Sequence, residues 1–290
     1  MVRTIHCVGD SHVHVFSGTN FLYPIWPAKT VNKIPSFKTY FTGPSLAYNL
    51  YKESAKSHDR EILFKILEKI DKKDLVLLSF GELDCRMIYL MKHVSHQNES
   101  IEKMIDDVLE RYFSAITEIK NMGYEVILLG SSPLIVSRFS GREKYPDDAD
   151  DREINRLKKE FNEKLLEEAK NRNIRVLSIL NELLNPNDDT KQQYFLDGAH
   201  LSQSAMPMIV KKLQTMLPFS EFLLFRNALL KKFPRKVQAF LFFVISWIKH
   251  FWFKSQNKIR WELLRFKKFL KHLFGEKIYR QIKSAFKTNQ

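Results

Sequence analysis

The sequence has very few cysteines, and those it has are not spaced to bind a metal. Cys7 and Cys85 are the only two in the chain. Each falls inside, or at the end of, a stretch that is predicted to be a buried strand. A disulfide scaffold needs more cysteines than this, so we expect two free thiols in a reducing compartment.

Long uncharged apolar runs are also missing. The first six residues lack the apolar stretch of a secretory signal peptide, so we expect a cytoplasmic protein without one. Within 218–290 the longest uncharged run, 237–248, has 12 residues. A bilayer-spanning helix needs roughly 20. We therefore expect this segment to lie on a surface and not to cross a bilayer.

Charge is divided unevenly along the chain. The formal net charge is +14, but 17 of the 47 basic residues and only 3 of the 33 acidic residues lie in 218–290. The apolar fraction of 44% is normal for a globular protein and argues against disorder throughout. We therefore expect two units. A neutral domain, 1–217, suits a small or neutral ligand, and a basic tail, 218–290, suits an anionic partner.

Residues 1–217 alternate between strand-like and helix-like segments. Short apolar runs that are typical of buried parallel strands occupy 4–9, 74–80, 124–130 and 174–179. Segments of helical period occupy about 46–70, 100–122, 151–172 and 202–217. This alternation predicts an α/β fold with a parallel sheet between helical layers. Residues 138–151 are predicted to form a long polar loop, a candidate lid.

Three polar motifs are predicted to meet at one edge of this sheet. Gly-Asp-Ser-His at 9–12 follows the first strand, Gly-Glu-Leu-Asp at 81–84 follows another, and Asp-Gly-Ala-His at 197–200 precedes the last helix. Parallel strands open their carboxyl ends onto one edge. A serine becomes nucleophilic when a histidine takes its proton, and a carboxylate fixes the tautomer of that histidine. The candidate nucleophile, base and orienting acid are Ser11, His200 and Asp197.

Each motif alone also has a purely structural interpretation. Gly-Asp-Ser is common in turns, and Asp197 could cap a helix that carries His200 on the surface. The combination is more specific, because the two motifs lie at the first strand and before the last helix of one predicted parallel sheet. It therefore favours a catalytic site.

These motifs resemble the SGNH, or GDSL-like, hydrolase superfamily over about 200 residues, on Gly9-Asp10-Ser11, the isolated Gly43, Gly-x-x-Asp at 81–84 and Asp-x-x-His at 197–200. The resemblance implies a three-layer, flavodoxin-like α/β fold followed here by a basic, aromatic-rich helical extension. It also implies that Ser11 attacks an acyl carbonyl and that backbone N–H groups of Ser11 and Gly43 stabilise the oxyanion. The family's remaining oxyanion donor is an asparagine.

The third motif departs from the family pattern. Gly81-Glu82-Leu83-Asp84 has leucine where the family has the asparagine donor. Losing one such donor costs about 100- to 1,000-fold in rate. Residues 81–86 instead resemble a Gly-Glu-(Ile/Leu)-Asp-x-Arg variant in SGNH-like proteins of bacterial polysaccharide biosynthesis. In an extended segment Glu82, Asp84 and Arg86 would share one face, with Arg86 as a replacement donor or substrate clamp. The alternative is an Asp84–Arg86 ion pair that only shapes the loop.

Histidines flank the serine, but their pattern does not favour a metal. His12 and His14 alternate and His6 precedes them, yet no carboxylate or cysteine has a matching spacing. We therefore expect no metal and no resident cofactor. His12 is expected to line the acyl-binding pocket, and Asp10 belongs to the same motif.

The tail combines basic and aromatic residues. Seventeen aromatic residues accompany its 17 Lys and Arg residues. Helices of this composition suit the interface of an anionic bilayer. Single-stranded nucleic acid is the competing partner, but the uncharged run 237–248 has no basic side chain that could bind phosphate groups. The composition favours a membrane surface, and packing of the tail on residues 1–217 is the structural alternative.

The motifs and the resemblance together predict a serine-dependent esterase that removes a small acyl group, namely acetyl, from a cell-surface or capsular glycan. Its substrate would be an acylated glycan or lipid-linked sugar at the cytoplasmic face of the inner membrane. An O-acyltransferase with acetyl-CoA as donor would use the same residues. An inactive SGNH scaffold that tethers a glycan-assembly complex is the third hypothesis, favoured by the missing asparagine and opposed by the intact triad.

Overall fold

The computed structural model describes residues 3–20, 32–51, 57–93, 99–138, 145–147 and 149–217. The predicted basic tail, 218–290, lies outside these residues, as does part of the candidate lid. The tail's predicted membrane-binding helices therefore stay a prediction.

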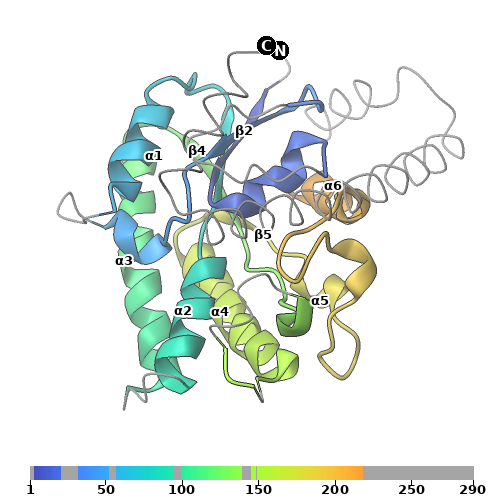
Figure 1. The fold of residues 1–290 in the computed structure, drawn as a ribbon. Helices are drawn as coiled ribbons and strands as arrows, with labels where there is room; N and C mark the ends of the chain where they lie inside the picture. Colours follow the sequence, from blue (N-terminus) through green and yellow to red (C-terminus); the bar gives the residue numbers. More distant parts are fainter. Residues whose placement is uncertain are drawn as a thin grey trace, which may run out of the picture. The chain divides into compact units, whose positions relative to one another are not determined.

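A five-stranded parallel sheet forms the centre of the described structure (Figure 1). Its order is β2-β1-β3-β4-β5. The strands are β1 (Ile5–Gly9), β2 (Phe37–Phe41), β3 (Leu75–Ser79), β4 (Glu125–Leu129) and β5 (Arg175–Leu177). Every residue of β1 and β3 is buried, because helices cover both faces of the sheet and a strand covered on both sides needs a continuous apolar run. The predicted α/β fold is confirmed.

Helices pack on both faces of this sheet. The helices are α1 (Asp59–Leu67), α2 (Glu82–His93), α3 (Ile101–Asn121), α4 (Asp151–Asn171), α5 (Leu180–Leu183) and α6 (Met206–Met216), with short 3-10 helices η1 (Ser11–Ser17), η2 (Ala47–Leu50), η3 (Val136–Arg138), η5 (Gln192–Tyr194) and η6 (Gln203–Ala205). One hydrophobic cluster joins the sheet to α1 to α4, and a second joins it to η1, α5 and α6. Successive residues of a strand point to opposite faces of the sheet, so Val76 belongs to the first cluster and Leu77 to the second.

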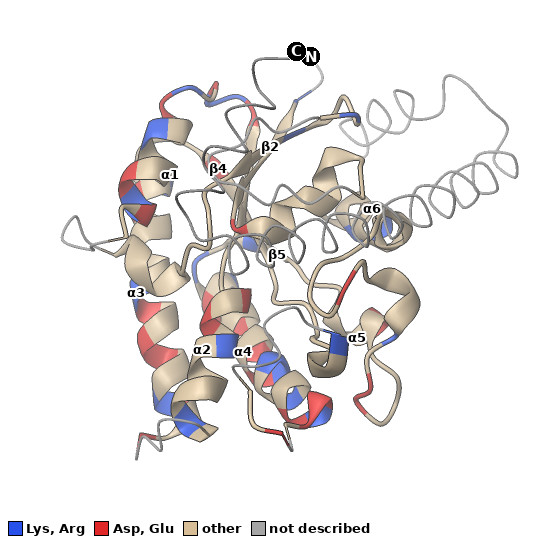
Figure 2. Cartoon of the chain, viewed as in Figure 1, with Lys and Arg blue, Asp and Glu red and all other residues tan. Residues whose placement is uncertain are grey.

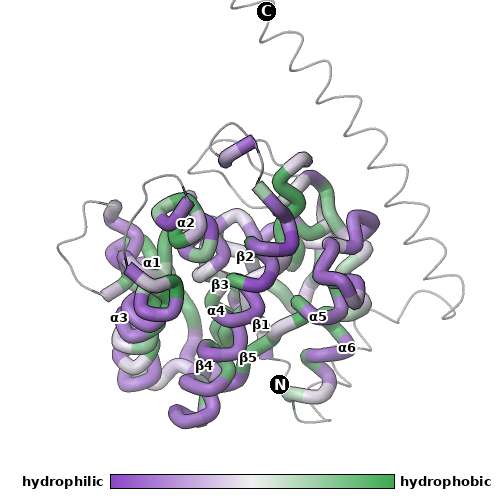
Figure 3. Tube along the Cα trace, turned by 90° about the horizontal axis from the view of Figure 1, so that it is seen from below, coloured by the Kyte–Doolittle hydropathy of each residue, from purple (hydrophilic) through white to green (hydrophobic). Residues whose placement is uncertain are grey.

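Charged residues lie mainly on the helices, and the sheet between them carries few (Figure 2). Hydrophobic and hydrophilic residues alternate along α3 (Figure 3). Within the described residues, no helix has the length and apolar character that a bilayer crossing would require.

The predicted segments match the structure unevenly. The four predicted strands correspond to β1, β3, β4 and β5, and three predicted helices correspond to α3, α4 and α6. The helix expected over 46–70 is instead η2 and α1, on either side of residues that are not described. Strand β2 and helix α2 were missed. Cys85 accordingly lies in α2 and not in a strand, although both cysteines are free and buried as expected.

The register of β1 and β3 brings two motifs to the same edge. Gly9, the last residue of β1, pairs with Ser79, the last residue of β3. The backbone N–H of Asp10 then donates to the carbonyl of Ser79 at 3.1 Å. Because both strands end together, the Ser11 motif and the Glu82 motif leave the sheet side by side.

A methyl group at Gly9 should break this pairing. An added Cβ atom would lie 2.0 Å from the backbone oxygen of Ser79, which cannot move without displacing β3. Overpacking a core typically costs about 1 to 3 kcal/mol, and we expect Gly9→Ala to lower the free energy of unfolding in urea by at least this much. The control is Gly123→Ala, which shares a positive φ, 94°, but whose nearest atom is 3.6 Å away, so that it carries the backbone strain without the clash. Equal losses in the two variants would contradict the steric explanation.

Candidate active site

The structure brings Ser11, His200 and Asp197 together in a hydrogen-bonded chain. The Oγ of Ser11, the first residue of η1, lies 2.7 Å from Nε2 of His200. The Nδ1 of His200 lies 2.8 Å from Oδ2 of Asp197. In this arrangement His200 donates its Nδ1 proton to the carboxylate, so that Nε2 can accept the serine proton. The geometry is that of a serine, its general base and the acid that orients the base.

Asp197 is held in its charged form by the turn that carries it. Its Oδ1 accepts the backbone N–H groups of Ala199 and His200, each at 2.8 Å. Burial alone would raise the pKa of Asp197, but the hydrogen bond and charge of His200 outweigh it and bring this pKa to about 2. The side chains of Asp197 and His200 are 28% and 16% exposed. Asp197 is therefore held as a carboxylate, and both side chains are partly accessible to solvent.

Backbone contacts fix the 197–200 turn against the end of β4. The N–H of Ile135 donates to the carbonyl of Gly198 at 2.7 Å. The N–H of Leu196 donates to the carbonyl of His200 at 2.8 Å, and an antiparallel bridge joins Phe195 to Leu201. The turn is therefore attached to the same edge of the sheet from which Ser11 leaves.

Asp10 has a structural position beneath the serine. It is buried, and its Oδ1 accepts the backbone N–H of His12 at 2.9 Å, which caps η1. Burial raises its pKa above the ordinary value. Asp10 thus fixes the turn on which Ser11 stands, while its carboxylate takes no part in the hydrogen-bonded triad.

Asp84 ties the segment that contains Gly43 to the 81–84 motif. Gly43 has a φ of 95°, which favours glycine, and the N–H of the preceding Thr42 donates to the carbonyl of Gly9 at 2.8 Å. The carboxylate of Asp84 accepts the N–H groups of Ala47 and Tyr48 at 2.8 and 3.0 Å. Burial raises the pKa of Asp84 to about 6 in spite of these bonds. Asp84 therefore positions the loop that follows Gly43.

The expectation of an extended third motif is wrong. Gly81 turns the chain with a φ of 104°, and helix α2 begins at the next residue. Glu82 and Arg86 are therefore one helical turn apart, and Nη2 of Arg86 lies 2.8 Å from Oε2 of Glu82. Arg86 pairs with Glu82 and Asp84 with backbone N–H groups, so the proposed Asp84–Arg86 ion pair is replaced by these contacts. An acidic first turn suits a helix N-terminus.

Glu82 is the centre of a buried ionic cluster that the sequence analysis missed. Its Oε1 lies 2.6 Å from Nζ of Lys158, and its Oε2 lies 3.0 Å from Nε2 of His12. The Lys158 side chain is 0% exposed and also donates to the carbonyl of Ser132 at 2.8 Å. Helical spacing from Ile154 to Phe161 could have placed Lys158 on the buried face of α4.

His12 lies in this cluster, and its expected role in lining the acyl-binding pocket stays a prediction. It is buried, and besides Glu82 it faces Oγ of Ser132, 3.4 Å from its Nδ1. His14 is also buried, with its ring against Phe41. In the described part of the chain, no three His, Cys, Asp or Glu side chains gather in a way that could hold a metal ion.

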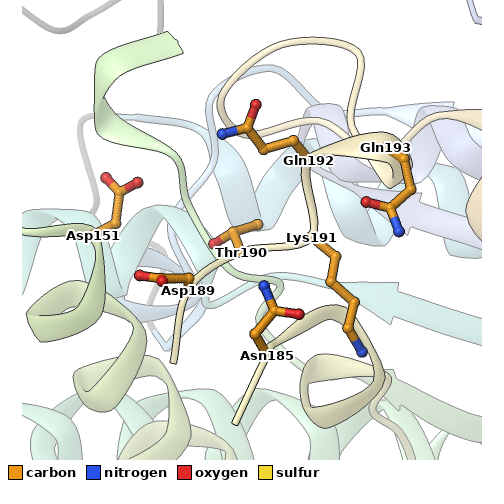
Figure 4. A pocket seen from close by; sticks show the side chains of 7 residues that line it. All are labelled: Asp151, Asn185, Asp189, Thr190, Lys191, Gln192 and Gln193. Carbon is orange, nitrogen blue, oxygen red and sulfur yellow. The ribbon is translucent and has the colours of Figure 1, made fainter. Parts of the chain in front are cut away.

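A separate polar hollow lies between the start of α4, the loop that follows α5 and the start of η5 (Figure 4). It has a volume of about 490 Å³. Its lining is Asp151, Asn185, Asp189, Thr190, Lys191, Gln192 and Gln193. Several of these groups already bond to the protein, as Thr190 does to the carbonyl of Leu134. None of the triad residues lines this hollow.

Comparison with known proteins gives matches among solved structures alone. No protein-family profile and no curated protein matches the chain. A GDSL-like lipase from Bacteroides thetaiotaomicron shares 15% identity over 74% of this chain and 89% of its own, with a TM-score of 0.47. An acetyl xylan esterase shares 15% over 74% and 100%, with a TM-score of 0.44. A member of the lipolytic G-D-S-L family from Veillonella parvula shares 15% over 74% and 98%, with a TM-score of 0.42.

GDSL-like structures thus match this chain, and this is the superfamily that its motifs resemble. At such identities the likeness concerns the fold. The assignment of roles to Ser11, His200 and Asp197 rests on their own contacts.

His14 should make the folded protein less stable in acid. Burial, with smaller effects from the charges of His200 and His12, lowers its pKa from 6.5 to about 4. In the unfolded chain the His14 imidazole is protonated below pH 6.5, whereas in the folded chain it stays neutral until about pH 4. The contribution of His14 to the free energy of unfolding is therefore fully present above pH 6.5 and is lost as the pH falls from 6.5 to about 4. At about 1.4 kcal/mol per pH unit, the loss is about 3 kcal/mol.

We therefore expect His14→Phe to make the free energy of unfolding less dependent on pH. Urea unfolding at pH 7 and pH 4 would measure the difference, with His58→Phe as the control because the side chain of His58 is 72% exposed. If His14→Phe and the wild type lose the same free energy between these values, the buried neutral imidazole is not the cause.

Proposed function

We propose that this protein is a serine-dependent ester hydrolase of the SGNH type. The observation that carries this proposal is the continuous hydrogen-bonded chain from Ser11 through His200 to Asp197. The serine stands at the start of η1, at the carboxyl edge of a parallel sheet, where ligands of such folds bind. The similar solved structures include a GDSL-like lipase and an acetyl xylan esterase, and these names denote the same class of reaction.

The geometry supports an acyl-enzyme mechanism. Oγ of Ser11 attacks the acyl carbon while its proton passes to Nε2 of His200, 2.7 Å away. The tetrahedral intermediate collapses as the alcohol leaves with that proton. Water then attacks the acyl-serine and gives a proton to His200. The second tetrahedral intermediate collapses with cleavage of the bond between the acyl carbon and Oγ of Ser11, which takes the proton back from His200 as the carboxylic acid is released. Asp197 stabilises the imidazolium that forms in both steps.

The oxyanion would be stabilised by the backbone N–H groups of Ser11 and Gly43. In the sequence motif Leu83 stands where the family has its asparagine, and a leucine side chain has no donor. Arg86, three residues along the same helix, is a proposed further contact for substrate.

The finer assignment rests on composition and on resemblance. We propose a small acyl group such as acetyl, a cell-surface glycan or lipid-linked sugar as the acylated substrate, and a cytoplasmic membrane surface as the place of action. The support is the Gly-Glu-Leu-Asp-Cys-Arg motif at 81–86 and the excess of Lys and Arg in 218–290. No metal or resident cofactor takes part in the proposed steps.

Removal of the serine hydroxyl should abolish the activity. We expect Ser11→Ala to lose both p-nitrophenyl acetate turnover and labelling by a fluorophosphonate, located by peptide mass spectrometry. Losing the nucleophile of such a triad costs about 10⁶-fold in kcat. The control is Ser114→Ala, at an exposed position in the middle of α3. Retained turnover in Ser11→Ala would refute the mechanism.

The same assay separates the two related hypotheses. Labelling of Ser11 with turnover that rises only when acetyl-CoA and a sugar acceptor are present would identify an O-acyltransferase. A wild-type chain that neither labels nor turns over under either condition would favour the inactive scaffold.

The tail should bind anionic membranes. We expect the full-length chain to sediment with vesicles that contain phosphatidylglycerol, and binding to weaken at high salt because the attraction is screened. Trp247→Ala with Trp252→Ala should reduce the bound fraction by about 10-fold, since apolar burial supplies the rest of the affinity. Zwitterionic vesicles are the control. Binding to single-stranded DNA with equal or greater affinity would contradict the membrane assignment.

A further inference from the structure

A fully buried lysine and glutamate lie next to the proposed triad, although they take no part in it. The side chains of Lys158 and Glu82 are 0% and 4% exposed, with 2.6 Å between Nζ and Oε1. Two charges lose their hydration at such a site, and an apolar pair of similar volume is often equally stable or more so. Stability alone therefore gives little reason to have this pair in the core.

The pair leads directly to His12, the residue after the nucleophile. Oε2 of Glu82 faces Nε2 of His12 at 3.0 Å, and Oγ of Ser132 faces Nδ1 at 3.4 Å. The backbone of Ser132 is in turn bound by Lys158 through its carbonyl, at 2.8 Å. Both ring nitrogens of His12 thus face oxygen atoms that the same lysine helps to place. The ring has a fixed position and a fixed plane.

The ring of His12 packs against the catalytic base. The centroids of the His12 and His200 rings are 5.2 Å apart, with 30° between their planes. His200 is otherwise held by its hydrogen bonds to Asp197 and Ser11 at the two nitrogens. These bonds leave the ring free to tilt about the axis that joins them, and the face of His12 limits that tilt.

The charges around His12 favour its doubly protonated form. Burial would lower its pKa, but the carboxylates of Glu82 and Asp10 outweigh burial and the opposing charge of Arg86, so the pKa lies above 6.5. The cations Arg86 and Lys158 and the proton of His12 in turn hold the pKa of Glu82 well below its ordinary value in spite of burial. His14, which also faces His12, is neutral near pH 7 because its pKa is about 4.

We propose that Glu82 and Lys158 are positioning residues that hold His12 as a fixed imidazolium wall, against which His200 is kept aligned with Ser11. This inference rests on the proposed serine mechanism and adds residues that act through the base. Small displacements of a catalytic group lower rates sharply, since an error of about 1 Å can cost about 100-fold. The cluster would thus increase the rate of serine attack while leaving substrate binding nearly unchanged.

The test is the full-length double variant Glu82→Leu/Lys158→Met. It removes both charges of the buried Lys158–Glu82 pair together, while Arg86 and His12 lose Glu82 as a partner. We expect kcat for p-nitrophenyl acetate and the rate of fluorophosphonate labelling to fall about 10- to 100-fold, with KM changed by less than about 3-fold. The control is Lys164→Met/Asp106→Leu, which removes a partly exposed ion pair between α4 and α3. It should keep the wild-type kcat.

A spectroscopic measurement on the wild type tests the inference even if the double variant does not fold. In protein with ¹⁵N-labelled histidine, we expect both ring nitrogens of His12 to carry protons at pH 7, with His12→Gln identifying the signals. In the folded double variant, the Nδ1 proton of His200 should exchange faster with water than in the wild type and in the control. A purely structural cluster would not change that proton.

Three results would overturn the inference. They are an unprotonated ring nitrogen on His12 at pH 7, an unchanged kcat in the folded double variant, and equal losses in the double variant and its control. Failure of the serine mechanism looks different, because Ser11 would then not label even in the wild-type chain.

Discussion

The parallel pairing of β1 with β3 is the constraint on which the candidate site depends. Gly9 and Ser79 end the two strands opposite each other, and no side chain separates them. The chain on one side turns into the serine of η1, and the chain on the other turns into the first residue of α2, Glu82. One register therefore brings a nucleophile and a buried carboxylate to neighbouring positions, and a slip of one residue would separate them.

Much of the architecture could be predicted from the sequence, because buried parallel strands require nearly continuous runs of apolar residues. The runs at 4–9, 74–80, 124–130 and 174–179 are nearly continuous in apolar residues, and each contains a strand of the sheet. Ser11, Asp197 and His200 could be selected for the same kind of reason, since their motifs stand at a strand end and before the last helix. The structure brings these three side chains into contact.

Other features depend on tertiary contacts that local patterns do not contain. Strand β2 has partly exposed residues and a neighbour on one side alone, so its apolar pattern is weak. Helix α2 begins directly after Gly81, and its acidic first turn gives no sign that Glu82 points inward to Lys158, Arg86 and His12. The helical spacing of Lys158 with Ile154 and Phe161 could place it on the buried face of α4, but this spacing does not say which residues it meets there. The partners in the ionic cluster are recognisable only once η1, α2 and α4 are assembled.

The contact between Ser11 and His200 joins residues 189 positions apart in sequence. The serine is thus synthesised well before the histidine, which belongs to nearly the last part of the described fold. All five strands, from β1 to β5, can be synthesised before the pair can form. A chain that ended before the 197–200 turn would lack the partner of the Ser11 hydroxyl, so this contact depends on completion of the described fold.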